Sequence, residues 1–165
     1  MAIRPILHYP HPTLKIDSAA VIPDDPATQA VAQDLLDTLD ASPGVALAAP
    51  QIGHAVRVIV VDVSRKKDEK GHGLIVMVNP VILALEGRKI LREGCLSVPD
   101  YTGNVLRYDQ AVVEGLTLDG RVVTLTTSGF EALAFQHEVD HLNGLLFLDR
   151  IQSLSTDLFR RKTSS

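Results

Sequence analysis

The sequence has a single cysteine, no tryptophan, three tyrosines and four phenylalanines. One cysteine excludes an internal disulfide and fits a reducing compartment. With so few aromatic residues, the core must consist mainly of Val, Leu, Ile and Ala. No run approaches the roughly 18 apolar residues that a membrane-spanning helix needs. The opening residues also lack the apolar stretch of a secretory signal. We therefore expect a cytoplasmic protein without a membrane function.

An excess of positive charge is also missing. The chain carries 16 Lys and Arg against 20 Asp and Glu, a net charge of −4, which gives no electrostatic reason to expect nucleic-acid binding. Basic residues cluster only at 65–67 and 160–162, and the acidic 68–69 pair dilutes the first cluster into a predicted solvated loop. At 165 residues, 45% of them hydrophobic, residues 1–165 are expected to form a single domain.

Local patterns predict an α+β fold. A helix is expected after Asp24 or Asp25, either of which can cap it, because Pro26 suits a first helical turn and apolar residues follow at helical spacing. Runs rich in β-branched residues predict strands at 55–64 and 73–80.

Further along, 111–129 reads as a hairpin that turns at Asp119-Gly120, and a second helix is expected from about Ser128 to Leu142. The whole is predicted to be antiparallel or mixed strands around this second helix, with an N-terminal helix and a C-terminal helical tail.

The second predicted helix contains the motif HExxH, in "FQHEVDHLNG" (135–144). His137 and His141 lie four residues apart, so on a helix both rings project from nearly the same side and can bind one cation. Glu138 lies next to the first ring, where it can act on a water molecule beside that cation. The pattern therefore predicts a metal site, provided that a third ligand exists.

No residue downstream is a convincing third ligand. Metzincins place a histidine six residues after the second one, and Phe147 stands there in this chain. No glutamate follows Glu138, and Asp149, after an apolar run, is expected at the end of a strand; Asp157 is the other remaining acid. The candidate is therefore upstream: Cys95, in a loop or at a strand end. One thiolate and two imidazoles leave a fourth coordination position open, as catalytic sites do.

Three motifs together resemble those of peptide deformylase of the bacterial type. They are "GVALAAPQ" (44–51), "EGCLS" (93–97) and "QHEVDHLNG" (136–144), in the order of that family. The resemblance extends over nearly the whole chain. It implies a metal-dependent hydrolase that removes the formyl group from the N-terminal formylmethionine of nascent polypeptides and releases formate.

The resemblance also implies roles for individual residues. Cys95, His137 and His141 would hold Fe²⁺, with Zn²⁺, Ni²⁺ or Co²⁺ as substitutes, because ligand softness alone suits zinc equally well. Glu138 would transfer the proton, and the Gln51 side chain and the Leu96 backbone N–H would stabilise the oxyanion.

The family's substrate site maps onto two groups of residues. An apolar slot for the methionine side chain is implied at Val45, Leu91, Phe130, Leu133 and Ala134. The segments beside the bound peptide contain Gly44, Ala46, Glu93 and Gly94. In addition, Arg107 is expected to pair with Glu93 and brace the cysteine loop, and the tail "DLFRRKTSS" is a candidate for transient ribosome contact. His8, His11, His54 and His72 are assigned no role.

One departure from the family pattern concerns Ala46, which stands where the second motif has a glycine. If this position needs a positive φ, alanine is strained; if its methyl group points away, the change is harmless. Three alternatives therefore remain: a relative impaired at Ala46, a purely structural Cys/His₂ metal site, and a zinc endopeptidase. The last is disfavoured because its downstream ligand is missing.

Overall fold

The computed structural model describes residues 2–161. Its helices are α1 (Pro26–Asp40), α2 (Gly129–Leu142) and the single turn α3 (Leu154–Asp157). Its strands are β1 (Ala46–Ala48), β2 (Val58–Val61), β3 (Ile75–Cys95), β4 (Val98–Leu116), β5 (Val122–Ser128) and β6 (Leu158–Arg160). Four 3₁₀ turns complete it: η1 (Pro12–Lys15), η2 (Ala49–Ile52), η3 (Val63–Arg65) and η4 (Phe147–Arg150).

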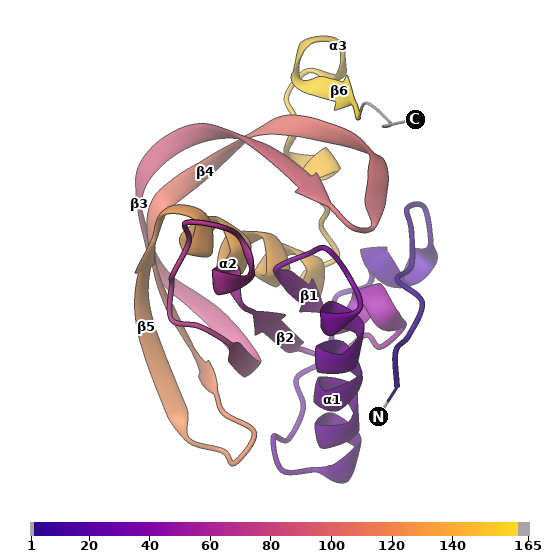
Figure 1. Cartoon of the computed structure of the whole chain (residues 1–165), viewed down its shortest axis with the longest axis vertical. Helices are drawn as coiled ribbons and strands as arrows, with labels where there is room; N and C mark the ends of the chain where they lie inside the picture. Colours follow the sequence, from indigo (N-terminus) through magenta and orange to yellow (C-terminus); the bar gives the residue numbers. More distant parts are fainter. Residues whose placement is uncertain (1, 162–165) are drawn as a thin grey trace.

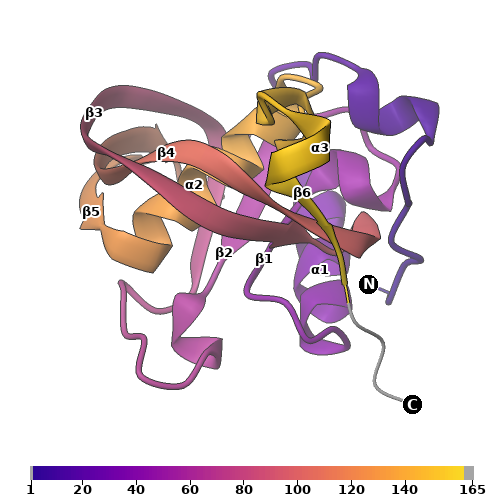
Figure 2. The same ribbon diagram turned by 90° about the horizontal axis from the view of Figure 1, so that it is seen from above.

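The strands form one antiparallel sheet in the order β1-β2-β3-β4-β5, and β6 pairs with β4. The long hairpin of β3 and β4 curves around α2, so that the helix lies within the bend of the sheet (Figures 1 and 2). Register shifts between Val78 and Val81 and between Ile82 and Ala84 interrupt the pairing where the hairpin bends. The fold is α+β, as predicted.

Helix α2 is the centre of the core. All residues from Glu131 to Leu142 are buried, and the apolar ones pack with β2, β3 and β4. The helix ends as predicted at Asn143-Gly144: Gly144 has φ +75°, and a Cβ there would lie 2.6 Å from the carbonyl oxygen of Lys15. This tight end fixes α2 against the N-terminal segment, and with it both histidines.

Helix α1 covers the outer side of the β1–β2 layer. Asp25 caps it by accepting a hydrogen bond from the Ala27 N–H at 2.9 Å, and Pro26 is its first residue, as expected. Its buried face packs on β1, η2 and β2. Within residues 2–161, no helix is both long and apolar enough to cross a membrane.

Several boundaries differ from the sequence prediction. The strand expected at 55–64 is only Val58–Val61, because the chain turns into η3 at Val63. The strand expected at 73–80 continues to Cys95, since its outer half is held by pairing with β4 and not by its own apolar pattern. Asp149 does not end a strand: it lies in η4, where its carboxylate accepts the Leu146 N–H at 2.8 Å.

The C-terminal tail is helical for only one turn. After α3 it becomes β6, which pairs with Tyr101 to Gly103 of β4. Residues 162–165, which include part of the basic tail proposed for ribosome contact, lie outside the described residues.

Candidate active site

Three donor atoms from two distant segments converge. His137 and His141 lie one turn apart on α2, with their Nε2 atoms 3.1 Å apart. Cys95, the last residue of β3, brings its Sγ to 3.3 Å from the His141 Nε2. All three ligand atoms lie within 4.8 Å of one another, and all three residues are buried. The structure therefore brings together the three residues that the sequence indicated as ligands.

Cys95 is placed by the tight turn of the long hairpin. It pairs with Val98, so only Leu96 and Ser97 connect β3 to β4. The Ser97 N–H points at the Cys95 Sγ from 3.4 Å, and the Gln51 Nε2 lies 3.8 Å from the same sulfur. Because the turn fixes both the sulfur and the donors around it, the thiol cannot rotate freely.

The three donors fit a small divalent cation. Donors about 2.0–2.3 Å from a tetrahedral ion lie roughly 3.3–3.6 Å from one another. Two of the three separations, 3.1 and 3.3 Å, are close to that spacing, and all three donor atoms lie within 4.8 Å of one another. A soft sulfur with two imidazole nitrogens suits Zn²⁺ or Fe²⁺ and is a poor set for Ca²⁺ or Mg²⁺. The residues present are therefore compatible with the metal that the sequence predicts.

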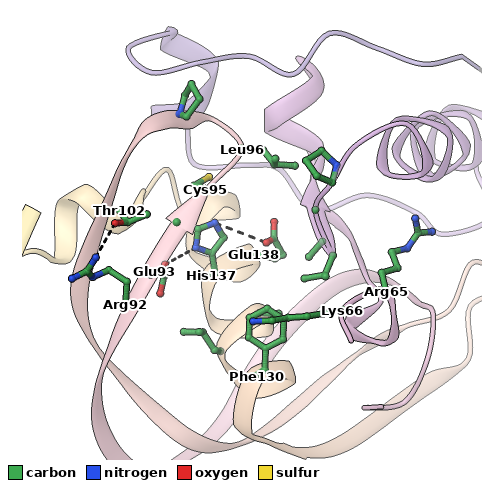
Figure 3. A pocket seen from close by; sticks show the side chains of 18 of the residues that line it. Arg65, Lys66, Arg92, Glu93, Cys95, Leu96, Thr102, Phe130, His137 and Glu138 are labelled. Atoms are coloured by element: carbon green, nitrogen blue, oxygen red, sulfur yellow. Dashed lines mark hydrogen bonds and ion pairs between the residues drawn. The ribbon is translucent and has the colours of Figure 1, made fainter. Parts of the chain in front are cut away.

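A buried chain of charges fixes the first histidine. The His137 Nδ1 lies 2.5 Å from the Glu93 Oε2 (Figure 3), so its Nε2 faces Cys95 and His141. Arg107 binds both Glu93 oxygens at 2.8 Å, as predicted, and its third nitrogen contacts Asp140 at 2.7 Å. Arg150 in turn binds Asp140 from the η4 side. The network joins β3, β4, α2 and η4 directly behind the site.

These neighbours set the charge states of the buried groups. Burial alone raises the pKa of Glu93, but the charges and hydrogen bonds of His137 and Arg107 outweigh it and bring that pKa to about 2. Burial lowers the pKa of both histidines. At His137 the charges of Cys95 and Glu93 prevail, and its pKa lies well above the ordinary value; at His141 burial and the His137 charge keep it well below. Cation binding would therefore displace a proton from this site.

Glu138 lacks the arginine partner that Glu93 and Asp140 have, and its ion-pair contact is with the His137 ring. Its Oε2 lies 4.0 Å from the His137 Nε2, and its buried Oε1 has no hydrogen-bond partner among the described residues. Burial, added to the charge of Glu93, raises the pKa of Glu138 to about 7 against the attraction of His137. A carboxyl group with that pKa can accept and return a proton near neutral pH.

Gln51 holds its amide nitrogen over the metal-site turn. It lies in η2, almost fully buried, and its Oε1 accepts the Ala48 N–H at 3.0 Å. This bond fixes the orientation of the amide, so its Nε2 donates to the Ser97 Oγ at 3.1 Å. The backbone of Leu96 lies in the turn beside Cys95. Both predicted oxyanion donors therefore lie close to Cys95, Gln51 through its side chain and Leu96 as the next residue of the chain.

A cavity of about 750 Å³ opens in front of these groups. Its walls include nearly every residue that the sequence assigned to the substrate site: Gly44, Val45, Ala46, Glu93, Gly94, Phe130, Leu133 and Ala134. Leu91 does not line it. Although Leu91 is on the same face of β3 as Glu93, it lies two residues further from the turn and pairs with Val105. His141 also lies behind the wall, covered by Cys95 and His137.

Ala46 is not strained. It lies in β1 opposite Val61, and the only residues other than glycine with positive φ among residues 2–161 are Asp68 and Asn79. The interpretation that alanine replaces a glycine needed for a left-handed backbone is therefore wrong.

Sequence reasoning missed several residues of the site. Asp140 lies three residues after His137 on α2, a spacing that could have suggested it. Arg65 and Lys66 are exposed, as predicted, but their place in the cavity lining was not foreseen. His72 was assigned no role, yet its Nδ1 lies 2.5 Å from the buried Glu131 at the start of α2. Burial raises the pKa of Glu131, but the hydrogen bonds from the His72 N–H and its neighbours lower it overall.

Comparison with known proteins agrees with this geometry. A family model described as polypeptide deformylase matches residues 3–157. A peptide deformylase of Syntrophobacter fumaroxidans is 43% identical over 162 residues, 98% of this chain and 94% of that protein. A crystal structure of a peptide deformylase from Legionella pneumophila matches with TM-score 0.84 at 40% identity, covering 93% of this chain and 88% of that one. A class I type b peptide deformylase from Acinetobacter baumannii, bound to Met-Ala-Ser, also matches with TM-score 0.84 at 37% identity, over 91% and 100% of the two chains.

Proposed function

The chain belongs to the polypeptide deformylase family and is a metal-dependent hydrolase of formylated nascent peptides; from that premise we propose how its own residues divide the work. The observation that carries the assignment is the convergence of Cys95, His137 and His141 beside a buried, unpaired Glu138 oxygen. A purely structural metal site does not require such a group, buried in the lining of a cavity.

We propose that Cys95, His137 and His141 hold the metal ion and that this ion is Fe²⁺, with Zn²⁺, Ni²⁺ or Co²⁺ as substitutes. Support comes from the mixed sulfur and nitrogen donor set and from the Glu93 bond that fixes the ring of His137. When bound, such an ion polarises the formyl carbonyl group and makes water more acidic.

Glu138 is the proton carrier in this proposal. It takes a proton from the attacking water and delivers it to the amine nitrogen that leaves as the N-terminus of the peptide. A pKa of about 7 suits both halves of that task, because the carboxyl group is ionised often enough to accept and weakly acidic enough to donate. Its burial beside His137 keeps it within the site throughout the reaction.

Gln51 and Leu96 are the proposed donors to the developing oxyanion. The Gln51 amide is held by the Ala48 N–H, and the Leu96 N–H by the two-residue turn, so neither has to reorganise during the reaction. Donors of this kind typically contribute about 3 kcal/mol each to stabilisation of the transition state. The methionine side chain is proposed to lie against Val45, Phe130, Leu133 and Ala134, which line the cavity. Leu91 is at most an outer neighbour of this slot.

The decisive experiment measures formate release from formyl-Met-Ala-Ser under anaerobic conditions, with metal content read on the same sample. Glu138→Gln keeps the shape of the side chain but cannot carry the proton. We expect it to retain the metal and the fold while losing at least about 10²-fold in kcat. Glu86→Gln, an exposed change on β3, is the matched control and should behave like the wild type. Retained activity in Glu138→Gln would contradict the assignment.

We propose three further points. A single domain over residues 1–165 is favoured by the family match over residues 3–157 and by a sheet that extends from β1 to β6. A cytoplasmic location follows from the lone cysteine and from the nascent-peptide substrate. Transient ribosome contact through the basic tail is supported by the exposed Arg160 and Arg161.

A further inference from the structure

The mouth of the cavity is positively charged, although the chain as a whole has a net charge of −4. Four cationic side chains line it: Arg65, Lys66, Arg92 and Arg161. Among residues 2–161, the only carboxylates that line the cavity are those of Glu93 and Glu138. Both are buried beside His137, away from the mouth. In the described part of the chain, no carboxylate therefore lines the outer part of the cavity beside these cations.

Arg65 differs from the other three, because Asp40 and Asp62 pair with it. Lys66 instead lies over the Phe130 ring, with its Nζ 4.2 Å from the ring centroid. Such contact with an aromatic face holds an ammonium group in place and leaves its charge available.

Arg92 and Arg161 are on the opposite wall, formed by β3 and the end of the tail. Arg92 stacks on Phe159 of β6 at 3.7 Å and makes only long contacts to Thr102 and Asn104. The Arg161 guanidinium lies directly over Gly94, where a Cβ would come within 2.6 Å of it. Among residues 2–161, no carboxylate pairs with Lys66, Arg92 or Arg161; we call these three the cationic rim.

The cationic rim lies where a bound peptide would leave the cavity. If the formyl group is beside Glu138 and the methionine side chain is against Phe130, the second and third residues must pass between these walls. Figure 3 shows Arg92 on one side of His137 and Glu138, with Lys66 over Phe130 toward the other side. A carboxylate on either following residue can therefore approach an unpaired cation.

We propose that this cavity favours formylated peptides with an acidic side chain at the second or third residue, and that Lys66, Arg92 and Arg161 determine this specificity. The proposal rests on the deformylase function proposed above. An exposed ion pair gives a modest preference, about two- to fivefold in kcat/KM, because water screens it.

The test compares isosteric peptides, all amidated at the C-terminus so that no other carboxylate is present. Formyl-Met-Ala-Glu-amide is paired with formyl-Met-Ala-Gln-amide, and formyl-Met-Glu-Ser-amide with formyl-Met-Gln-Ser-amide. In at least one pair we expect kcat/KM for the acidic member to be about threefold higher at low salt. The ratio should fall to near one at about 1 M salt, where the Debye length is only about 3 Å and exposed ion pairs are screened.

Variants then identify the residues that cause the preference for acidic peptides. Lys66→Gln, Arg92→Gln and Arg161→Gln should each lower the acidic-to-neutral ratio by about 1.4-fold. Arg88→Gln removes the same charge from β3 outside the cavity lining and should leave the ratio unchanged.

The outcomes separate the two levels of the argument. A ratio of one or less in both pairs at low salt, or a ratio insensitive to salt, overturns the specificity proposal even if formate is released from every peptide. If Arg88→Gln lowered the ratio as much as the other variants do, the preference would be due to overall charge, and the assignment to the cationic rim would be refuted. Release from no peptide at all would instead contradict the proposed function.

Discussion

Replacing Arg107 with methionine would test the buried network behind the metal site. Arg107 is only 3% exposed, and three of its nitrogens bind Glu93 and Asp140 at 2.7–2.8 Å. Methionine fills similar space but leaves the Glu93 carboxylate buried with His137 as its sole remaining partner. Asp140 keeps its contact with the partly exposed Arg150. Glu93 therefore bears most of the loss.

Two independent estimates give the expected magnitude. Removing one partner from a buried ion pair typically costs about 3–5 kcal/mol. Separately, the pKa of Glu93 is lowered from 4.5 to about 2, because His137 and Arg107 together outweigh the effect of burial. That displacement corresponds to about 3 kcal/mol of stabilisation, of which Arg107 supplies a share. The second estimate lies below the first, and we expect Arg107→Met to lower the free energy of unfolding by about 2–3 kcal/mol at pH 7.

The dependence on pH follows from the sign of the shift. A lowered carboxyl pKa stabilises the fold above the unfolded value of about 4.5, and the stabilisation is lost as pH falls toward 2. The difference between the wild type and Arg107→Met should therefore be full above about pH 5 and shrink below it. In the double variant Glu93→Gln/Arg107→Met the two losses should not add, because the neutral amide no longer needs a cation.

Urea unfolding from pH 4 to 8, with metal titration on the same proteins, measures both effects. Weaker metal binding is expected in Arg107→Met, since Glu93 no longer holds His137 in position. Arg88→Met, an exposed arginine of the same hairpin, should change stability by less than about 0.5 kcal/mol. A loss below about 1 kcal/mol at pH 7, or one that grows in acid, would refute the reasoning.

Three other substitutions have clear expectations. Gln51→Ala removes a proposed oxyanion donor and should lower kcat by about 10²-fold or more with little change in KM, as steady-state formate assays would show. An effect confined to KM would contradict this role. Ala46→Gly should not raise kcat/KM, because Ala46 has no backbone strain to relieve. In urea unfolding, the same change should lower the free energy of unfolding by about 0.5–1 kcal/mol. A large gain in activity would show instead that the methyl group obstructs the substrate. Gly71→Ala should lower the melting temperature, since Gly71 has φ +56° and a Cβ there would collide with Glu131; an unchanged melting temperature would contradict that packing.

Much of the site could be predicted because its signals are local. On a helix, the four-residue spacing of His137 and His141 places both rings on the same side. The C-terminal end of that helix is marked by Asn143 and Gly144. The Asp119-Gly120 turn and the Asp25 cap are equally local. The sequence around Cys95 made it only a candidate third ligand, and the resemblance carried by three motifs then implied that role.

Tertiary structure decided what depends on register and on chain segments meeting. The pairing of β3 with β4 and the rotation of α2 above them bring Asp140 to Arg107, in addition to the Glu93 partner that the sequence predicted. The same register places Leu91 outside the cavity and β6 beside its mouth. A sequence pattern indicates whether a segment forms a helix or a strand, but not the register in which that segment packs against its neighbours. The three candidate metal ligands and the Arg107–Glu93 pair could therefore be predicted from the sequence, whereas Asp140 and the cations around the cavity were determined only by the fold.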